Sequence, residues 1–412
     1  MRPRHAASPF IMLTVLLDAV SIGVVVPVLP KLIETLTGHA SVTAWGFGAM
    51  QLAFALAQFF SAPILGALAD HHGRRPVLLM GMLSMAASFM AAALTDQFWV
   101  LLLFRALSGA ACANMAVANA YVADVTKPED MPRQYGLLSA MFGLGFILGP
   151  ALGGLLGDHH VRWPFWLAGG LTLANFVYGC LILPESLPPE KRRPLRVPSP
   201  FASMAYLRRL KGVAPLLWVL AAASLVQAAV ETCWMLYTAF RFNWTPGDNG
   251  LSLLALGVVA VLSQGVFMRP VQKLLSARAM VVWGQASFIA CLVAWGLATE
   301  SWMMYAVSAA NVLGYLLYPS VQSLIAGQID KGQHGESMGA LSSIVSVTAV
   351  IGPALAAPLM AVVANWPKTS WQVGLPFFAS AAVLCVAAAV SVPALLRPTR
   401  PGAPDATGAR SG

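Results

Sequence analysis

Apolar stretches of about twenty residues recur along the whole chain and alternate with short charged gaps. Each stretch is long enough to cross a hydrocarbon layer about 30 Å thick. Of the 412 residues, 58% are hydrophobic and 10% are charged, whereas about 25% of an ordinary soluble domain is charged. A water-soluble fold is therefore excluded. We expect twelve transmembrane helices, with boundaries near residues 9–31, 44–69, 76–95, 98–123, 134–157, 163–183, 214–240, 249–268, 279–299, 302–326, 337–363 and 372–396.

The basic residues predict the orientation of these spans. An even number of spans places both chain ends on one side, and most of the 25 Lys and Arg residues lie on that side. The exceptions are Lys31, Arg162, Arg241 and Lys368 on the other side and Arg105 within a span. Because short cytoplasmic loops carry the excess of Lys and Arg, both termini are expected in the cytoplasm. The net charge of +9 then reflects orientation, and without an aromatic-and-basic motif no nucleic-acid partner is expected.

The longest connection divides the chain. Residues 185–213 are rich in Pro and Arg and lack an apolar period, so we interpret them as a flexible cytoplasmic linker. They separate a six-helix half at 1–184 from a second at 214–397, and the Pro- and Gly-rich tail at 398–412 is expected to be disordered.

An internal repeat supports this division. A shift of 203 residues places Gly136–Ser139 on Gly339–Ser342 and Gly149–Gly154 on Gly352–Ala357, so the fifth and eleventh spans correspond. Two related halves with a substrate held between them near the midplane are a common design of secondary transporters. Channels and membrane enzymes have less need of this arrangement.

Glycines form a stripe in the fifth span. Gly145, Gly149, Gly153 and Gly157 recur every four residues, which places them on one helical face where another helix can approach closely. Pro150 removes a backbone donor and favours a local bend. The stripe serves either static packing or a sliding interface, and the pattern alone leaves both open.

Three ionisable side chains lie inside predicted spans, where a charge is costly and by default marks a functional site. Asp18 lies about 12 Å into the first span at 1.5 Å per residue, Arg105 is in the fourth span and Glu231 is in the seventh. Asp18 is either a titrating or substrate-coordinating acid or a buried carboxylate bonded to nearby backbone. Glu231 has the same two interpretations, with Gln227 one turn away as a structural partner. Arg105 does not deprotonate and is expected to act as a fixed counter-charge.

The loop after the second span carries a specific motif. Gly66–Pro76 resembles the signature of the major facilitator superfamily, with Gly66, Asp70, Gly73, Arg74 and Arg75 in register. The glycines permit a tight turn. Asp70 stands at a helix C-terminus, where a lone anion is unfavourable, and needs Arg74 or a neighbouring helix N-terminus as partner. The resemblance implies that Asp70 and Arg74 act in gating.

Further segments are similar to the drug/proton antiporter branch, and in particular to tetracycline/proton antiporters. They are Leu17–Asp18 with Pro27 and Pro30, Arg105 with Gly109, Gly145 through Gly149, Pro150, Gly153 and Gly154, Tyr121–Thr126, and Pro184–Ser186. The resemblance implies that Arg105 takes part in proton coupling and Asp18 in substrate or proton handling.

The chain also departs from that family. Acids that tetracycline exporters carry in the third and ninth spans fall on Ser88 and Phe288, whereas Glu231 stands where they have a neutral residue. Whether a metal–tetracycline chelate is recognised therefore stays open. Four polar side chains are expected either to line a cavity or to bond between helices: Gln51, Gln58, Asn114 and Asn119.

We therefore expect an all-helical major facilitator fold in a bacterial inner membrane, functional as a monomer without cofactor or metal. It would export a small amphipathic molecule, such as a tetracycline or another drug, in exchange for protons. A proton-coupled metabolite symporter on the same fold is the alternative, since sequence pattern does not set transport direction. A membrane-embedded enzyme or scaffold is more distant, because no Ser/His/Asp set, metal-ligand spacing or phosphate loop is present.

Overall fold

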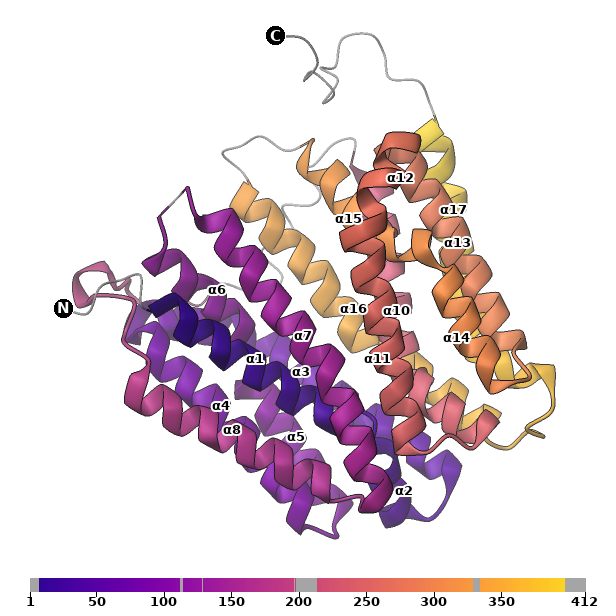
Figure 1. Cartoon of the computed structure of the whole chain (residues 1–412), viewed down its shortest axis with the longest axis horizontal. Coiled ribbons are helices and arrows are strands. Elements are labelled where there is room, and N and C mark those ends of the chain that lie inside the picture. Colours follow the sequence, from indigo (N-terminus) through magenta and orange to yellow (C-terminus); the bar gives the residue numbers. More distant parts are fainter. Residues whose placement is uncertain are drawn as a thin grey trace. The chain divides into compact units, whose positions relative to one another are not determined.

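The computed structural model of the chain describes residues 7–111, 114–127, 129–195, 197, 213–328 and 334–396, and all their side chains but those of residues 7, 8, 114 and 334–340. Helices joined by short connections make up this part of the chain, and it contains no strand (Figure 1). In the first half the helices are α1 Ala7–Val25, α2 Leu29–Thr37, α3 Ala40–His72, α4 Arg74–Leu94, α5 Phe98–Ala111, α6 Asn114–Val125, α7 Met131–His159 and α8 Trp163–Ile182. After the short η2 turn Pro189–Lys191 come α10 Ala214–Phe242, α11 Pro246–Leu262, η3 Ser263–Phe267, α12 Met268–Leu274, α13 Ala277–Leu297, α14 Ser301–Ala310, α15 Val312–Ala326, α16 His334–Val363, η5 Trp371–Gly374 and α17 Leu375–Leu396.

The expected all-helical membrane fold is confirmed. Within the described residues, eleven helical segments are long and apolar enough to span a membrane, and Val312–Ala326 is a shorter apolar helix at the place of the expected tenth span. A helix satisfies every backbone N–H and C=O within its own segment, which the hydrocarbon core requires. The predicted spans and the observed helices therefore coincide along the chain.

Three of the spans are not the continuous helices that the sequence predicts. The first stops at Val25 and restarts at Leu29, with Pro30 in the first turn of α2, where its missing N–H costs nothing. The eighth passes through a π-helix, η3, between α11 and α12. The tenth breaks at Asn311, whose side-chain oxygen accepts a hydrogen bond from Ser287 Oγ at 2.8 Å. This bond comes from α13, 24 residues earlier in the chain, so the Asn311 side chain at the break is held by tertiary packing.

The described chain divides into two compact units. Unit 1 comprises Met1–Pro200, Ala229–Val258 and Ala349–Val373, and unit 2 comprises Phe201–Ala228, Val259–Thr348 and Gly374–Gly412. The division passes through α10, α11 and α16. The two sequence halves at 1–184 and 214–397 stay a prediction.

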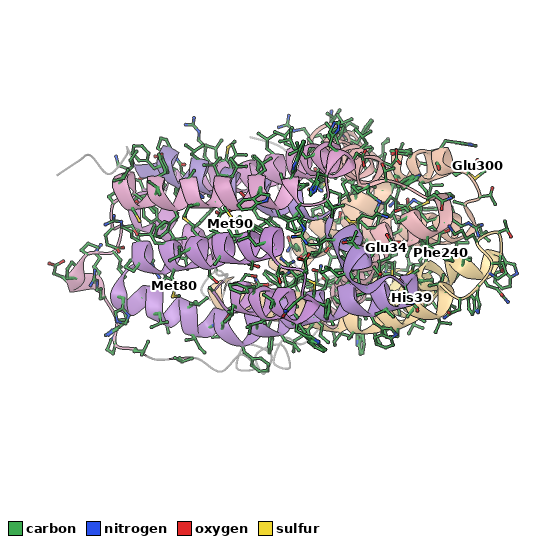
Figure 2. The ribbon with its side chains drawn as sticks, turned by 90° about the horizontal axis from the view of Figure 1, so that it is seen from below. Glu34, His39, Met80, Met90, Phe240 and Glu300 are labelled. Atoms are coloured by element: carbon green, nitrogen blue, oxygen red, sulfur yellow. The ribbon has the colours of Figure 1, made fainter. Side chains whose placement is uncertain are left out.

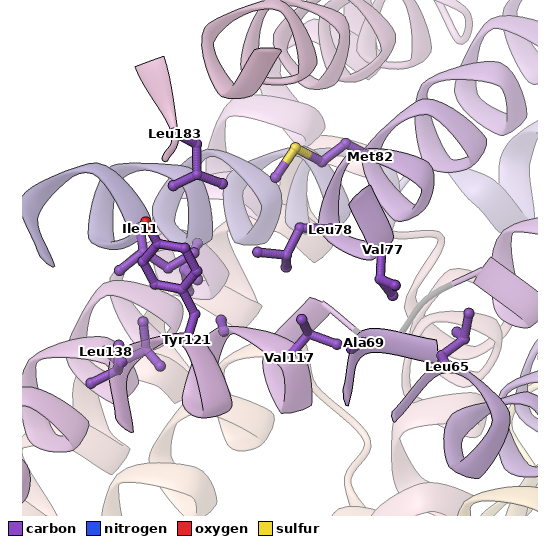
Figure 3. Close-up of a cluster of buried hydrophobic side chains, with 13 residues drawn as sticks. Ile11, Leu65, Ala69, Val77, Leu78, Met82, Val117, Tyr121, Leu138 and Leu183 are labelled. Atoms are coloured by element: carbon purple, nitrogen blue, oxygen red, sulfur yellow. The ribbon is translucent and has the colours of Figure 1, made fainter. Parts of the chain in front are cut away.

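Unit 1 is built on close pairs of helices: α1 packs on α7 and α8, α3 on α5, and α4 on α8. Its core lies where the ends of α1, α3, α4 and α6 meet (Figure 3). Tyr121 of α6 is fully buried there, in the same cluster as Ile11, Leu78 and Met82, and its hydroxyl donates to the carbonyl of Pro184 at 2.9 Å. We call this the loop end of unit 1, because it carries the Gly66–Arg75 loop.

Side chains at the opposite end come from α2, from the connection between α2 and α3, and from α10. Glu34, His39 and Phe240 lie toward one end of unit 1, away from Met80 and Met90 of α4 (Figure 2). The Met90 side chain fills the space that Gly169 of α8 leaves open. The connection between α2 and α3 therefore lies at the same end as the last turn of α10.

Unit 2 has its own apolar contacts. In it α13 packs on α15 and α17, and the rings of Trp295 and Phe377 lie 5.9 Å apart. Ser391 Oγ of α17 donates to Gln285 Oε1 of α13 at 3.3 Å, and both side chains are fully buried.

Candidate functional site

The signature loop has the ion pair that its sequence requires. Arg74 Nη1 lies 2.5 Å from Asp70 Oδ1, one turn earlier, and Arg74 Nε lies 3.2 Å from Oδ2 of Asp124 on α6. The Arg74 side chain is 12% exposed, against 38% for Asp70 and 22% for Asp124. One largely buried guanidinium therefore joins the ends of three helices, and the predicted pairing of Asp70 with Arg74 is observed.

Glu185 occupies the N-terminus of α4. Its Oε1 accepts from the backbone N–H of Arg74 at 2.8 Å, and its Oε2 accepts from that of Arg75 at 3.2 Å. The same carboxylate also accepts from the N–H groups of Ser186 and Leu187. The first N–H groups of a helix have no partner within the helix, and a carboxylate is favourable there. In the sequence, Glu185 belongs to a resembling segment, and no role was predicted for it.

Gly73 makes this capping possible. It has a φ of +113°, which L side chains rarely adopt. A Cβ on Gly73 would also overlap the Glu185 carboxylate, whereas a Cβ on Gly66 would meet nothing within 4 Å. The two signature glycines therefore differ. The backbone angle and the Glu185 carboxylate exclude a side chain at Gly73, whereas no neighbouring atom excludes a Cβ at Gly66.

The start of the predicted linker is bonded to the loop end. Ser186 Oγ donates to Asp124 Oδ2 at 3.1 Å, and the Arg193 N–H donates to the carbonyl of Asp70 at 3.1 Å. Arg75 Nη2 donates to the carbonyl of Cys180 at 2.5 Å. Residues 185–193 are therefore attached to unit 1, while 196 and 198–212 lie outside the described residues. A cavity of about 480 Å³ lies beside this network, with Asp70 and Arg74 in its lining.

Asp18 lies half-buried in α1, where α8 supplies a hydrogen-bond donor. Asn175 Nδ2 donates to Asp18 Oδ1 and to the backbone carbonyl of Thr14, each at 3.0 Å. Asn175 is fully buried. Asn175 was not predicted from the sequence, because it lies 157 residues from Asp18 in the chain.

Arg105 is held against α3. Its Nη2 donates to Gln51 Oε1 at 3.1 Å, and its guanidinium lies 4.3 Å from the centre of the Phe54 ring. A Cβ on Gly109 would overlap the Phe54 backbone, so the small residue one turn after Arg105 lets α5 approach α3. Of the four polar side chains expected in a cavity or between helices, Gln51 is therefore placed beside Arg105.

The contacts of the described residues do not bring the other predicted site residues together. These are Glu231, Gln58, Asn114 and Asn119. Glu231 is exposed on α10, as is Gln227. Gln58 and Asn119 are half-buried, and the Asn114 side chain lies outside the described residues.

The glycine stripe of α7 faces α1. A Cβ on Gly145 would overlap Ala19 and the backbone beside it, one on Gly149 would overlap Gly23, and one on Gly153 would overlap Val24. The predicted close helix approach is therefore observed, and its partner is α1.

Gly154 belongs to another face of α7. A Cβ on Gly154 would overlap the Pro246 carbonyl and would lie 3.1 Å from the Cα atoms of Gly247 and Gly250 of α11. Pro150 is in the same contact, because its carbonyl lies where a Cβ on Gly250 would be. Helix α7 therefore uses glycine on two faces, toward α1 and toward α11.

Asp158 completes the contact of α7 with α11. Its Oδ1 accepts from the Gly247 N–H at 2.9 Å, and its Oδ2 accepts from Thr245 Oγ at 3.3 Å. Like Glu185 at α4, Asp158 is a carboxylate that caps the N-terminus of a helix from another part of the chain. Asp158 was not predicted from the sequence, since its partners are 87 and 89 residues away.

Comparison with known proteins agrees with this architecture. The family model described as Major Facilitator Superfamily matches residues 11–273 and 233–412. The chain is 35% identical to the tetracycline resistance protein of class C from Escherichia coli, over 89% of this chain and 92% of that protein. It is 30% identical to the class B protein from Escherichia coli, over 98% and 100%, and 28% identical to the quinolone resistance protein NorA of Staphylococcus aureus, over 82% and 86%.

Solved structures share the fold. A nucleoside transporter, NupG, in a mutant form, superimposes with a TM-score of 0.75 at 13% identity, covering 95% of this chain and 100% of that one. The human organic anion transporter MFSD10 gives a TM-score of 0.68 at 22% identity, with the same coverage. The match to the family model, the extent of the similarity to curated relatives and the helical architecture agree, and the chain belongs to the major facilitator superfamily.

Proposed function

We propose that this protein exports small amphipathic drugs across a bacterial inner membrane in exchange for protons. The observation that carries the proposal is the half-buried Asp18 carboxylate in the first span, held by Asn175. A carboxylate inside a span is costly and is retained where it binds an ion or a substrate. The named relatives confer resistance to tetracycline and to quinolones, which supports export of drugs.

In this proposal the ionisable groups have separate tasks. Asp18 binds a proton and releases it when the drug is bound, so that the two move in opposite directions. Arg105 stays charged and is fixed by Gln51 and Phe54, so it biases the field around the site without moving a proton itself. Glu231 on α10 supplies a second acidic group.

The capped helix ends act as gates. At the loop end, Arg74 joins Asp70 to Asp124. At the opposite end, Asp158 joins α7 to the N-terminus of α11. Exchange requires a transporter to open to one side at a time. We assign the Asp158 contact to closure of one side and the Arg74 network to closure of the other.

The spans contain few ionisable side chains, which favours an amphipathic small molecule as the substrate. Pockets for amphipathic ligands are mostly apolar with a few placed polar groups. Tetracycline is one candidate, although Ser88 and Phe288 are buried and neutral where the resembling exporters carry acids. Other drugs, including quinolones, are the other candidates.

We propose that both termini lie in the cytoplasm, which the charge bias supports, and that the protein works as a monomer. A reporter that is active only in the cytoplasm, fused after Gly412, should be active. An inactive fusion beside an active periplasmic reporter would reverse the orientation.

The test of the function is a pH-gradient assay in everted membrane vesicles. Tetracycline, a quinolone and a panel of other drugs are added in turn, and collapse of the gradient reports exchange. We expect at least one drug to collapse it in wild type and none in Asp18→Asn at equal expression. If no drug acts on wild-type vesicles, drug/proton exchange is refuted, and a wild-type response in Asp18→Asn refutes the assignment of Asp18.

A further inference from the structure

We propose that Asn175 is the positioning residue of the Asp18 carboxylate, a buried amide whose N–H group fixes that carboxylate on the α8 side of α1. The inference rests on the proposed function, because it assigns to Asn175 a role toward the acid that couples protons to transport. The residue itself touches neither proton nor drug in this assignment and acts through Asp18.

The two hydrogen bonds of Asn175 fix the direction of its amide. Nδ2 donates to the Thr14 carbonyl and to Asp18 Oδ1, each at 3.0 Å. Turning the amide would place Oδ1 against both of these oxygens, so the bond to the Thr14 backbone keeps the donor toward Asp18. A hydrogen bond to an ionised acceptor is stronger than one between neutral groups, and the amide therefore holds the carboxylate in place most firmly when it is charged.

Burial shows that this amide is more than a space-filling side chain. Asn175 is 0% exposed, and its Oδ1 has no hydrogen-bond partner among the described residues. The Thr14 hydroxyl, 1% exposed, likewise has none there. A buried polar atom without a partner destabilises a protein, and an apolar residue of similar size would avoid that cost. The amide is thus retained for the donor that it directs at Asp18.

The same helix offers a matched control. Thr172 lies three residues before Asn175 on α8, is also fully buried, and donates its hydroxyl to the carbonyl of Ala168 in its own helix at 2.8 Å. Thr172→Ala removes a buried polar side chain from α8 without removing a bond to α1. It therefore reports what loss of packing alone does to the protein.

The test labels Asp18 directly. Dicyclohexylcarbodiimide reacts with protonated carboxyl groups inside membranes, and peptide mass spectrometry of the full-length protein in vesicles follows the modification at Asp18. A carboxyl oxygen that no longer accepts from the Asn175 amide is more accessible to the carbodiimide. Asn175→Ala should therefore speed labelling of Asp18 by about tenfold, as for loss of one charge-assisted hydrogen bond, with Thr172→Ala within about twofold of wild type.

A second variant keeps the test decisive if Asn175→Ala does not fold. Asn175→Asp keeps the shape of the side chain but replaces the donor by a second carboxylate, so it should speed labelling of Asp18 at least as much. Labelling of Asp18 at the wild-type rate in the folded variants would overturn the proposal. Equal acceleration in Thr172→Ala would also overturn it, because the effect would then follow from packing.

Transport measurements separate this proposal from the proposed function. Asn175→Ala should slow drug export driven by a pH gradient by about tenfold and leave drug–drug exchange without a gradient within about twofold. In an Asp18→Asn background the substitution should have no further effect. If Asp18→Asn itself exports normally, the function of Asp18 is refuted. If Asp18→Asn is inactive while Asn175→Ala behaves as wild type, only the role of Asn175 is refuted.

Discussion

Alanine at Gly73 should lower the free energy of unfolding, whereas alanine at Gly66 should raise it. Gly73→Ala places a Cβ at a φ of +113° and against the Glu185 carboxylate. The backbone strain amounts to about 1–3 kcal/mol. Displacing Glu185 also weakens its bonds to the N–H groups of Arg74 and Arg75, at about 1.5–3 kcal/mol for a hydrogen bond to a charged group. The two ranges add to an expected loss of about 2.5–6 kcal/mol. Gly66→Ala, which has open space in a helix interior, should instead gain up to about 1 kcal/mol.

The free energy of unfolding of the purified protein, measured by SDS titration in mixed micelles, tests this pair. Glu185→Gln separates the two contributions, because it weakens the cap without straining Gly73. It should lose less than Gly73→Ala does. A loss of under about 1 kcal/mol in Gly73→Ala would refute the reasoning, since strain alone accounts for that much. A larger loss in Gly66→Ala than in Gly73→Ala would refute it as well.

Three further substitutions test the gates and the helix contacts. Asp70→Asn should lower the maximal rate of drug export several-fold and change the KM by less than about twofold, because it removes a gate contact and not a drug contact; an unchanged maximal rate would contradict the assignment. Gly153→Ala should destabilise the protein by about 1–3 kcal/mol, because its Cβ would overlap the α1 backbone. Gly143→Ala on the same helix has open space and should not destabilise it. Equal thermal stability of the two variants would count against the contact. Asp158→Asn removes the charge at the N-terminus of α11, which stabilises that helix end by about 0.3–1 kcal/mol. Hydrogen exchange at the Gly247 amide should therefore accelerate about two- to fivefold. Exchange at the wild-type rate would rule out a stabilising charge.

The sequence predicted the spans well because membrane insertion leaves a strong local signal, a long apolar run. It missed the breaks at residues 26–28 and at Asn311, because these depend on where the chain packs. At Asn311, for example, the bond from Ser287 is made by a residue 24 positions away. Pro27 and Pro30 of the first span were noted in the sequence, but prolines alone do not predict that the helix ends there.

The site was predictable where its partners are neighbours in sequence. Asp70 and Arg74 are one turn apart, so their ion pair followed from helix geometry. Glu185 and Asn175 were missed because Glu185 meets its α4 partners, and Asn175 meets Asp18, more than a hundred residues away, and no local pattern marks such a contact. The glycine stripe showed that a helix would approach, but Gly154 revealed its second partner, α11, only in three dimensions.

The cap on α4 has a consequence for biogenesis. The carboxylate that accepts from the N–H groups of Arg74 and Arg75 belongs to Glu185, which lies 111 and 110 residues further along the chain. At a synthesis rate of about 5–20 residues per second, that is a delay of roughly 5–20 s. During that time α4 can enter the bilayer but its first turn is not satisfied by its final partner. The ribosome must deliver all six of the first spans and Glu185 before this corner of the protein can close, so a nascent chain released before Glu185 lacks the cap however well its helices insert.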